Sequence, residues 1–178
     1  LQTGDVDACF SIVKHTSYPA YKDSSVGWHP TSKRKEMCDP TKSYLLIRAE
    51  PSTTTTTSSI PSTFAPNLDT DILAFASFKI ENDDPPHEDR PLVYIYEVHV
   101  GEGLRGRGLG KYMVWCIEAM ADTNHISKTE LTVFKSNEVA IKAYKKLGYS
   151  RDEASPEDRK VRGRVIMADY MIMSKHWG

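Results

Sequence analysis

Apolar residues repeat with a helical spacing over residues 109–120. They fall three, four, seven, eight and eleven positions after the first, at Leu109, Tyr112, Met113, Cys116, Ile117 and Met120. This spacing puts all of them on one face of a helix. The pattern therefore predicts a helix that ends near residue 121 and packs on the core through this face, Cys116 included.

A strand and a glycine-rich loop precede this helix. Residues 94–100 are dense in β-branched and aromatic side chains, which is typical of a strand. Residues 101–110 contain five glycines interleaved with Arg105 and Arg107. Glycines at a helix start let backbone N–H groups approach a ligand closely, and the unpaired N–H groups and the helix dipole favour an anion. The order strand, loop, helix therefore predicts a site for a phosphate group.

The same patterns predict the remaining elements. The other expected strands are residues 44–49, 72–80, 130–134 and 164–175. A helix from about residue 5 is expected to end before Pro19, because proline lacks an amide hydrogen. Ser136 or Asn137 caps a further helix, and Gly148 suits the position after its end. The apolar face of that helix is predicted to comprise Val139, Ala140, Ala143, Tyr144 and Leu147. This order of elements predicts a mixed α/β domain with one central sheet.

Four polar segments are predicted to lie between these elements. Residues 51–70 carry a Thr/Ser run and three prolines, so they cannot bury enough apolar surface to become ordered, and we expect a disordered insertion. Residues 33–35, Lys-Arg-Lys, are interpreted as a solvated turn. Residues 81–89 are interpreted as an acidic hairpin tip, or alternatively as a landing site for a basic peptide. Residues 150–163 are interpreted as a charged loop.

Composition limits the function classes. The chain has 178 residues, enough for a single domain over residues 1–178, and its net charge is −1. This charge gives no general argument for nucleic acid or a membrane surface. No apolar run reaches the roughly 18–20 residues of a spanning helix. Cys9, Cys38 and Cys116 show no paired spacing, which indicates a reducing compartment. The chain does not begin with Met and has no signal-like start, as in a trimmed chain.

The glycine-rich loop can be compared with three phosphate-binding motifs. A Walker loop needs Ser or Thr after Gly-Lys, and Tyr112 occupies that position. A dinucleotide fingerprint matches the first three glycines by letter, but they come too early because the helical period begins near Leu109. Residues 105–110, Arg-Gly-Arg-Gly-Leu-Gly, fit the pattern Arg/Gln-x-x-Gly-x-Gly/Ala. That pattern resembles the acetyl-CoA loop of the GCN5-related N-acetyltransferases (GNATs), in which the loop backbone holds the CoA pyrophosphate.

A second stretch resembles the same family. Residues 131–149 are similar to a signature made of a strand, then Asn-x-x-Ala-x-x-x-Tyr/Phe, then Leu-Gly-Phe/Tyr. The matching residues are Asn137, Ala140, Tyr144, Leu147, Gly148 and Tyr149. The resemblance implies a GNAT fold, with a central, mostly antiparallel sheet splayed around acetyl-CoA and with flanking helices.

More narrowly, the chain resembles the N-alpha-acetyltransferase D branch of this family. The stretches that carry this likeness are residues 94–97 (Tyr-Ile-Tyr-Glu), the glycine-rich loop, residues 131–135 and Gly27-Trp28. That branch acetylates the α-amine of core histones whose tails begin Ser-Gly-Arg-Gly. The resemblance implies an acetyl-CoA-dependent, metal-free, monomeric enzyme that acts on histone tails in nucleus and cytoplasm, without direct binding of nucleic acid or membrane.

The chemistry of the family sets what the site must contain. An amine attacks the acetyl thioester directly, so the site must bind CoA, orient the amine, remove a proton and stabilise the oxyanion. An α-amine, with a pKa of roughly 7.7–8.0, requires a modest base, whereas a lysine amine at about 10.4 needs more help. Glu97 is the candidate base, directly or through water, because burial in an apolar strand would raise its pKa.

The site residues that we expect fall into three groups. The catalytic candidates are Glu97, Tyr96, Tyr94 and Tyr144. The CoA contacts implied by the resemblance are Val98, His99, Val100, Arg105, Gly106, Arg107, Gly108, Leu109, Gly110, Lys111, Asn137, Ala140 and Tyr144. The expected peptide contacts are Tyr21, Trp28, Glu81, Tyr94, Tyr96 and Tyr170.

Several of these residues have structural alternatives. Glu97 could be a structural acid paired with an arginine or a tyrosine, and Tyr94 and Tyr96 could be walls of a core or groove. Tyr144 could protonate the leaving thiolate or pack against the CoA arm. Trp28 could belong to a satellite core cluster.

Strand alternation bears on which of these side chains meet. Alternation places Tyr94, Tyr96 and Val98 on one face of the strand. It places Ile95, Glu97 and His99 on the opposite face, unless a bulge intervenes.

Three functions remain open from the sequence. The first is acetylation of protein N-termini, with acidic residues of the 81–89 segment receiving the basic tail. The second is a GNAT acting on lysine side chains or a small amine. The third is a GNAT-like module that binds acyl-CoA or peptide without turnover.

Overall fold

The computed structural model describes residues 3–49, 71–161 and 164–177. The insertion predicted at residues 51–70 lies outside the described residues. Within the described ranges, six strands form one sheet in the order β1-β2-β3-β4-β8-β5. Their bounds are β1 Ser43–Arg48, β2 Ile72–Asn82, β3 Pro91–Val100, β4 Lys128–Phe134, β5 Ser150–Arg151 and β8 Tyr170–His176. All neighbouring pairs are antiparallel except β3 and β4. The fold is therefore the mixed α/β arrangement that the sequence predicts.

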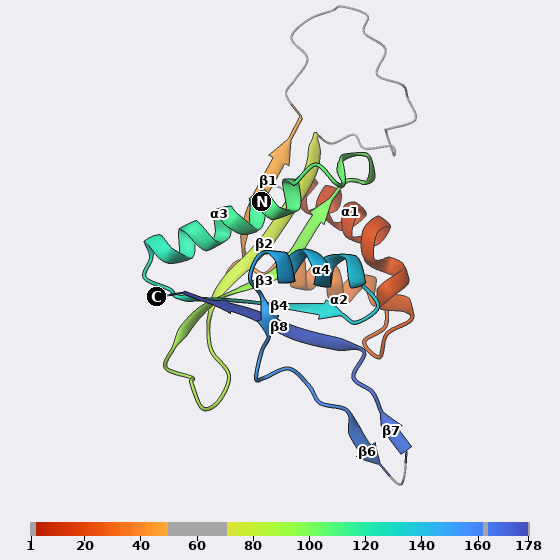
Figure 1. Cartoon of the computed structure of the whole chain (residues 1–178). Coiled ribbons are helices and arrows are strands. Elements are labelled where there is room, and N and C mark those ends of the chain that lie inside the picture. Colours follow the sequence, from red (N-terminus) through yellow and green to blue (C-terminus); the bar gives the residue numbers. More distant parts are fainter. Residues whose placement is uncertain (1–2, 50–70, 162–163, 178) are drawn as a thin grey trace, which may run out of the picture.

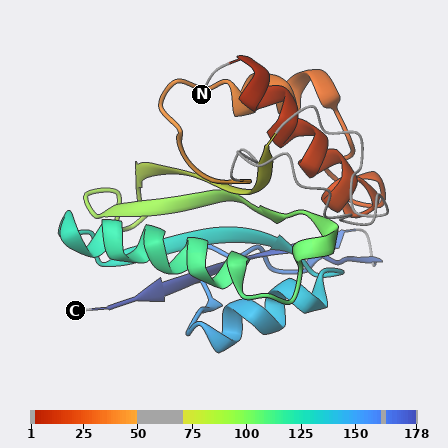
Figure 2. The same cartoon turned by 90° about the horizontal axis from the view of Figure 1, so that it is seen from above.

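Helices cover both faces of this sheet (Figures 1 and 2). The helix bounds are α1 Thr3–Lys22, α2 Pro30–Met37, α3 Leu109–Thr123 and α4 Glu138–Lys146. Figure 2 shows α1 and α2 on one side of the sheet, and α3 and α4 on the other. None of the helices in the described part of the chain is long and apolar enough to cross a membrane.

Buried side chains of the described residues form two clusters, one for each face. The first joins the inner side of α3 to residues of β2, β3 and β4, with Ala76, Val93 and Ile117 among its members. The second joins α1 and Met37 of α2 to Phe75 of β2. The sheet is thus buried on both sides, and β2 contributes residues to both clusters.

The last strand and the segment before it differ from the prediction. Instead of a loop followed by one strand over residues 164–175, the chain forms a small hairpin before β8. Its strands are β6 Arg159–Val161 and β7 Arg164–Ile166, and they form a separate two-stranded sheet. In Figure 1 this hairpin projects from the main sheet. The pattern does not reveal the break because residues 165–173 are apolar apart from Asp169.

The N-terminal helix does not end before Pro19 as expected. α1 continues to Lys22 and contains Pro19. Its last turn is held by packing, because Tyr18 and Tyr21 both contact the ring of Trp28, with centroid distances of 5.8 and 5.5 Å. Tertiary contacts therefore outweigh the amide hydrogen bond that proline cannot make.

α2 is a second correction, since the sequence predicts a solvated turn at residues 33–35. Pro30 lies at the start of the helix, where a missing amide hydrogen costs nothing. The helix is polar, but Lys33 and Met37 are buried. The buried lysine points to a partner in the interior.

α3 begins at Leu109 as predicted, but its buried face is rotated from the expected one. Met113 and Ile117 are buried, and Met120 packs against the core. Tyr112 is 56 % exposed, and Cys116 is half-buried. Val114 and Ala121 are buried instead.

Candidate active site

A cleft opens where β3 and β4 separate. The two strands pair in parallel at three positions, and the last pair joins Ile95 to Leu131. Beyond this pair the strands line the two walls of a cleft of about 740 Å³. Residues from the glycine-rich loop, from α1 and from α4 complete its lining. The cleft therefore brings together both sequence signatures.

A bulge in β3 decides which side chains reach this region. Ser77 of β2 pairs with Glu97, and the next residue, Phe78, pairs with Ile95, so Tyr96 is the extra residue. The bulge reverses the alternation: Ile95 and Val98 both pack on the cluster beneath α3. The predicted grouping of Ile95 with Glu97 and His99 is therefore wrong.

On the opposite face of the sheet from Ile95, two polar residues of β3 meet the N-terminal helices. His99 contacts Thr16 of α1, and Glu97 contacts Lys33 of α2.

The glycine-rich loop forms a backbone cradle at one end of the cleft. Gly106 and Gly108 have φ angles of 77° and 82°, a left-handed conformation that glycine adopts without the steric cost of a side chain. Gly108 is also the N-cap of α3, whose first amides have no partner within the helix. Arg105 and Lys111 line the cleft beside them. Exposed amides, a helix N-terminus and two cations suit a pyrophosphate, so this part of the chain fits the CoA expected from the sequence.

α4 supplies an apolar wall. The side chain of Asn137 caps this helix by accepting a hydrogen bond from the Ala140 amide at 3.1 Å. Val139 is 81 % exposed although it lies on the predicted apolar face. Val139, Ala140, Ala143, Tyr144 and Leu147 all line the cleft. The face predicted to pack in the core is therefore partly open and faces the cleft.

Glu97 is buried between Lys33 and His99. One carboxylate oxygen forms an ion pair with Lys33, and the other contacts Nε2 of His99. Nδ1 of His99 lies 2.7 Å from the hydroxyl of Thr16, which in turn donates to the carbonyl of Ile12 at 2.8 Å. Burial raises the pKa of Glu97, but the charges and hydrogen bonds of His99 and Lys33 outweigh it and lower the pKa to about 2. The expectation of a raised pKa is therefore wrong.

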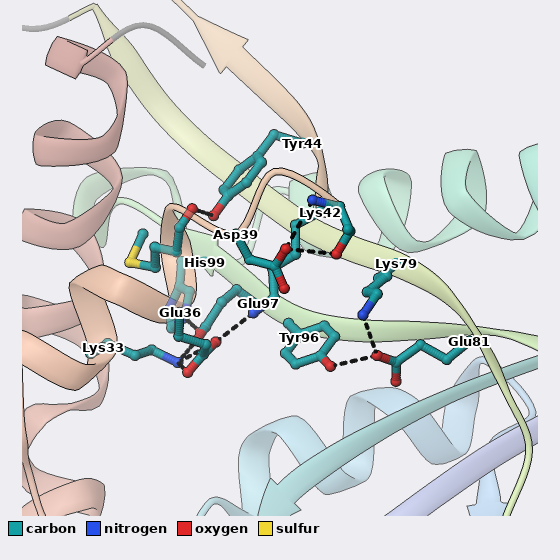
Figure 3. A network of polar contacts seen from close by, with 12 residues as sticks. Lys33, Glu36, Asp39, Lys42, Tyr44, Lys79, Glu81, Tyr96, Glu97 and His99 are labelled. Carbon is teal, nitrogen blue, oxygen red and sulfur yellow. Dashed lines mark hydrogen bonds and ion pairs between the residues drawn. The ribbon is translucent and has the colours of Figure 1, made fainter.

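Charged side chains continue from Glu97 around Tyr96 (Figure 3). Lys33 also lies 3.0 Å from Glu36, whose other carboxylate oxygen lies 2.7 Å from Nζ of Lys42. Nζ of Lys42 sits over the ring of Tyr96, 3.5 Å from its centroid. The hydroxyl of Tyr96 donates to Glu81 at 2.9 Å, and Lys79 pairs with the same carboxylate at 3.2 Å. We call these residues the Tyr96 charge cluster: Lys33, Glu36, Lys42, Lys79, Glu81, Tyr96 and Glu97.

The tyrosines of the site hold their protons strongly. Burial is the first cause in each case. It raises the pKa of Tyr94 to about 12, and burial together with the charge of Glu97 raises the pKa of Tyr144 to about 12. The pKa of Tyr96 is also raised, by burial and by Glu81. At neutral pH these phenols are donors.

Most of the predicted site residues line the cleft. They are Tyr21, Tyr96, Glu97, Val98, His99, Val100, Arg105, Gly106, Gly108, Leu109, Gly110, Lys111, Asn137, Ala140 and Tyr144. Within the described chain, five predicted residues lie outside its lining: Trp28, Glu81, Tyr94, Arg107 and Tyr170.

Two of these five have clear alternative partners. Trp28 packs in an aromatic cluster with Phe10, Tyr18 and Tyr21, which is the core alternative considered from the sequence. Tyr170 begins β8, opposite Phe134. Sequence reasoning missed Thr16, Lys33, Glu36 and Lys42, because nothing in the local pattern relates them to β3.

The acidic 81–89 segment is less available than expected. Asp83 is buried, where it pairs with Lys128 at 2.7 Å and with Arg90. The acidic residues Asp84, Glu88 and Asp89 are exposed. Asp83 is therefore not available to a basic peptide, whereas these three residues are.

Comparison with known proteins identifies the family. Residues 28–149 match the Acetyltransferase (GNAT) family. The chain belongs to this family. The match covers the Tyr96 bulge, the glycine cradle and α4, so all of the cleft lining of this GNAT protein except the α1 residues lies within the matched stretch.

Individual relatives agree with this assignment. N-alpha-acetyltransferase 40 of Saccharomyces cerevisiae is 33 % identical over 97 residues, which are 47 % of this chain and 34 % of that protein. This GNAT chain thus spans about a third of the length of that curated relative.

Two solved structures share the fold. Arabidopsis thaliana NAA60 in complex with a bisubstrate analogue has a TM-score of 0.67 at 14 % identity, over 100 % of this chain and 96 % of that chain. The PaiA N-acetyltransferase of Thermoplasma acidophilum in complex with coenzyme A has a TM-score of 0.61 at 14 % identity, over 99 % of this chain and 96 % of that chain.

Proposed function

We propose that this chain transfers the acetyl group of acetyl-CoA to the free N-terminal α-amine of a protein. The observation that carries the proposal is the cleft between β3 and β4, which joins the glycine cradle to the bulge that presents Tyr96 and Glu97. The similarity to N-alpha-acetyltransferase 40 of Saccharomyces cerevisiae supports the class of acceptor.

Gly106, Gly108 and the first turn of α3 would hold the pyrophosphate of acetyl-CoA, and the α4 wall would contact its arm. When bound, acetyl-CoA supplies an activated thioester. The amine nitrogen forms the new C–N bond, the C–S bond breaks, one proton leaves the nitrogen, and the CoA sulfur gains one. The chain's task is to orient the amine and to handle these two protons.

Glu97 is the proposed proton acceptor, directly or through water. Its low pKa makes it a weak base. A weak base suffices for an α-amine, because this amine is already partly neutral near pH 7.5. Its nitrogen then becomes acidic once the new C–N bond forms. Tyr144 is the proposed donor to sulfur, since its phenol lines the cleft and stays protonated at neutral pH.

Within this class, the substrate that we propose is a histone tail beginning Ser-Gly-Arg-Gly. Support comes from the resemblance of residues 94–97 and 131–135 to the histone-acetylating branch. Tyr21 and Tyr96 line the cleft and would contact the first residues of the tail. The exposed Asp84, Glu88 and Asp89 would attract its basic residues. For an enzyme with such a substrate we propose a location in nucleus and cytoplasm.

A mass-spectrometric assay on two forms of one peptide tests this proposal. Both forms begin Ser-Gly-Arg-Gly-Lys, one with a free N-terminus and the other with a blocked N-terminus and a free lysine. We expect product on the free α-amine alone. Product on the blocked peptide would replace the proposal with a lysine acetyltransferase, and acetyl-CoA binding without product on either would replace it with a small-amine enzyme or a binding module.

A further inference from the structure

Lys33 is a buried cation paired with Glu97, which lines the cleft. Its side chain is 8 % exposed, and Nζ pairs with Glu97, lies 3.0 Å from Glu36 and lies 3.2 Å from the hydroxyl of Tyr21. Burial lowers the pKa of Lys33, but the charge of Glu97, followed by Tyr21 and Glu36, outweighs burial and raises the pKa overall. Lys33 therefore stays charged throughout the pH range of an enzyme assay.

The positive and negative side chains of the Tyr96 charge cluster are equal in number. Each of its three glutamates has a lysine partner: Glu97 with Lys33, Glu36 with Lys42, and Glu81 with Lys79. The groups that face Lys33 and Glu97 from the surrounding elements are Tyr21, Glu36, Lys42, Tyr44, His99 and Tyr144. Neutral phenols and paired ions leave little net negative charge to stabilise a further cation at Glu97.

We propose that Lys33 is a specificity-determining residue: its charge repels ammonium groups from the position beside Glu97 and restricts the acceptor to amines that are neutral in solution. This inference rests on the proposed acetylation of α-amines, and it explains how one cleft would distinguish an N-terminus from a lysine side chain. The discrimination comes from charge rather than from the shape of the acceptor.

The ionisation of the two amines sets the size of the effect. At pH 7.5 roughly a third of an α-amine with a pKa of about 7.8 is neutral, against roughly 0.1 % of a lysine amine with a pKa of about 10.4. A site that admits neutral amines alone therefore prefers the α-amine by a few hundred-fold. Without Lys33, Glu97 would have one cation fewer, and its carboxylate could pair with a lysine ammonium and take its proton. The preference should then decrease.

The test compares kcat/KM on two peptides, one with a free N-terminus and no lysine, and one with a blocked N-terminus and a single lysine. We expect a preference above roughly 100-fold for the α-amine in the wild-type enzyme, and a preference at least tenfold smaller in Lys33→Met. Lys33→Arg retains the charge and should keep the wild-type preference. Lys35→Met removes an exposed cation from the same helix, and it should also leave the preference unchanged.

The pH profile gives a readout that a purely structural role would not change. In the wild type, kcat/KM on the free N-terminus should rise with pH and level off near the pKa of the peptide amine. In Lys33→Met the rising limb should move to lower pH by at least half a unit. A wild-type profile that is already flat between pH 6.5 and 7.5 would overturn the inference without any variant, even if Lys33→Met does not fold.

The outcomes separate this inference from the proposed function. If the wild type forms no product on the free N-terminus, the proposed function fails, and the inference fails with it. If the wild type is specific for the α-amine but folded Lys33→Met keeps the preference within threefold, the inference alone is wrong. Circular dichroism and thermal unfolding of each variant establish that the folded enzyme is being compared.

Discussion

The hydroxyl of Tyr94 lies 2.5 Å from the hydroxyl of Thr132 and joins β3 to β4 at the point where the strands begin to separate. The two residues lie on either side of the last parallel pair, Ile95 with Leu131. Thr132 lines the cleft, whereas Tyr94 lies outside its lining. We therefore assign Tyr94 a role in holding the strands, although the sequence also predicts it as a catalytic and peptide-binding residue.

Replacing Tyr94 by Phe removes this bond and keeps the ring. We expect the free energy of unfolding to fall by about 1 kcal/mol, the usual net value of such a bond, and the turnover rate to stay within about threefold of wild type. A double-mutant cycle that combines Tyr94→Phe with Thr132→Val, measured by urea unfolding, tests this. Most of the loss in the free energy of unfolding should appear as coupling energy between the two residues. A turnover rate that drops by two orders of magnitude or more would return Tyr94 to the catalytic set.

The ion pairs of Glu97 predict how stability depends on pH. Its pKa is lowered from 4.5 to about 2 in the folded chain. Since the folded state binds this proton less readily than the unfolded state, the stabilisation is complete above pH 4.5 and is lost as the pH falls towards 2. Glu97→Gln should cost about 3–5 kcal/mol at pH 7, because it leaves Lys33 buried with one partner fewer.

Urea unfolding of wild type and Glu97→Gln from pH 7 to pH 2.5 checks this sign. The difference between the two free energies of unfolding should be constant above pH 5 and should shrink below it. Glu138→Gln, on the exposed pair with Lys142, is the matched control and should show a small, flat difference. A difference between wild type and Glu97→Gln that grows on acidification would contradict the assignment.

Gly108 allows a test of the cradle that depends on the backbone alone. A Cβ at this position meets nothing within 4 Å, but φ is +82°. Gly108→Ala should therefore cost about 1–2 kcal/mol through backbone strain and raise the KM for acetyl-CoA by roughly tenfold if the loop shifts. Gly4→Ala, in the first turn of α1 with the same open surroundings, should instead be stabilising by about 0.5–1 kcal/mol. Equal effects of the two substitutions would argue against a strained cradle.

Tyr144 can be tested as the proton donor to sulfur. Its pKa of about 12 keeps the phenol protonated across pH 6–10, so Tyr144→Phe should lower kcat by about 100-fold with little change in KM. Tyr149→Phe is the control, because its hydroxyl bonds Thr129 at 2.8 Å within the core. That variant should lose stability and keep its kcat. A Tyr144→Phe enzyme with full kcat would leave Tyr144 as a packing residue.

The residues that local rules define could be predicted from the sequence. Gly106 and Gly108 are the residues that a left-handed backbone requires, and they stand where the helical period of α3 begins. Asn137 caps α4 in the way that its side chain predicts. These features depend on neighbours a few positions away, so one stretch of sequence contains the whole argument.

Lys33 and Tyr96 could not be predicted in the same way. Lys33 lies in a polar helix, and its partner Glu97 is far along the chain, so burial of the lysine follows from tertiary contacts alone. The bulge at Tyr96 reverses the strand alternation without any glycine or proline to mark it. The exposure of Val139 is similar, because an apolar helix face is typical of a core whether it packs on protein or lines a cleft.

The short parallel junction between β3 and β4 also has a consequence for biosynthesis. β1, β2 and β3 pair as successive neighbours, so they can assemble as soon as they leave the ribosome. β3 then remains an open sheet edge until residues 128–134 have been translated, and open edges invite pairing with other chains. We expect pulse-labelled amides of β4 to become protected after those of β2, so the strand that opens the cleft would join the sheet only after β1, β2 and β3 have paired, and β5 and β8 would follow it.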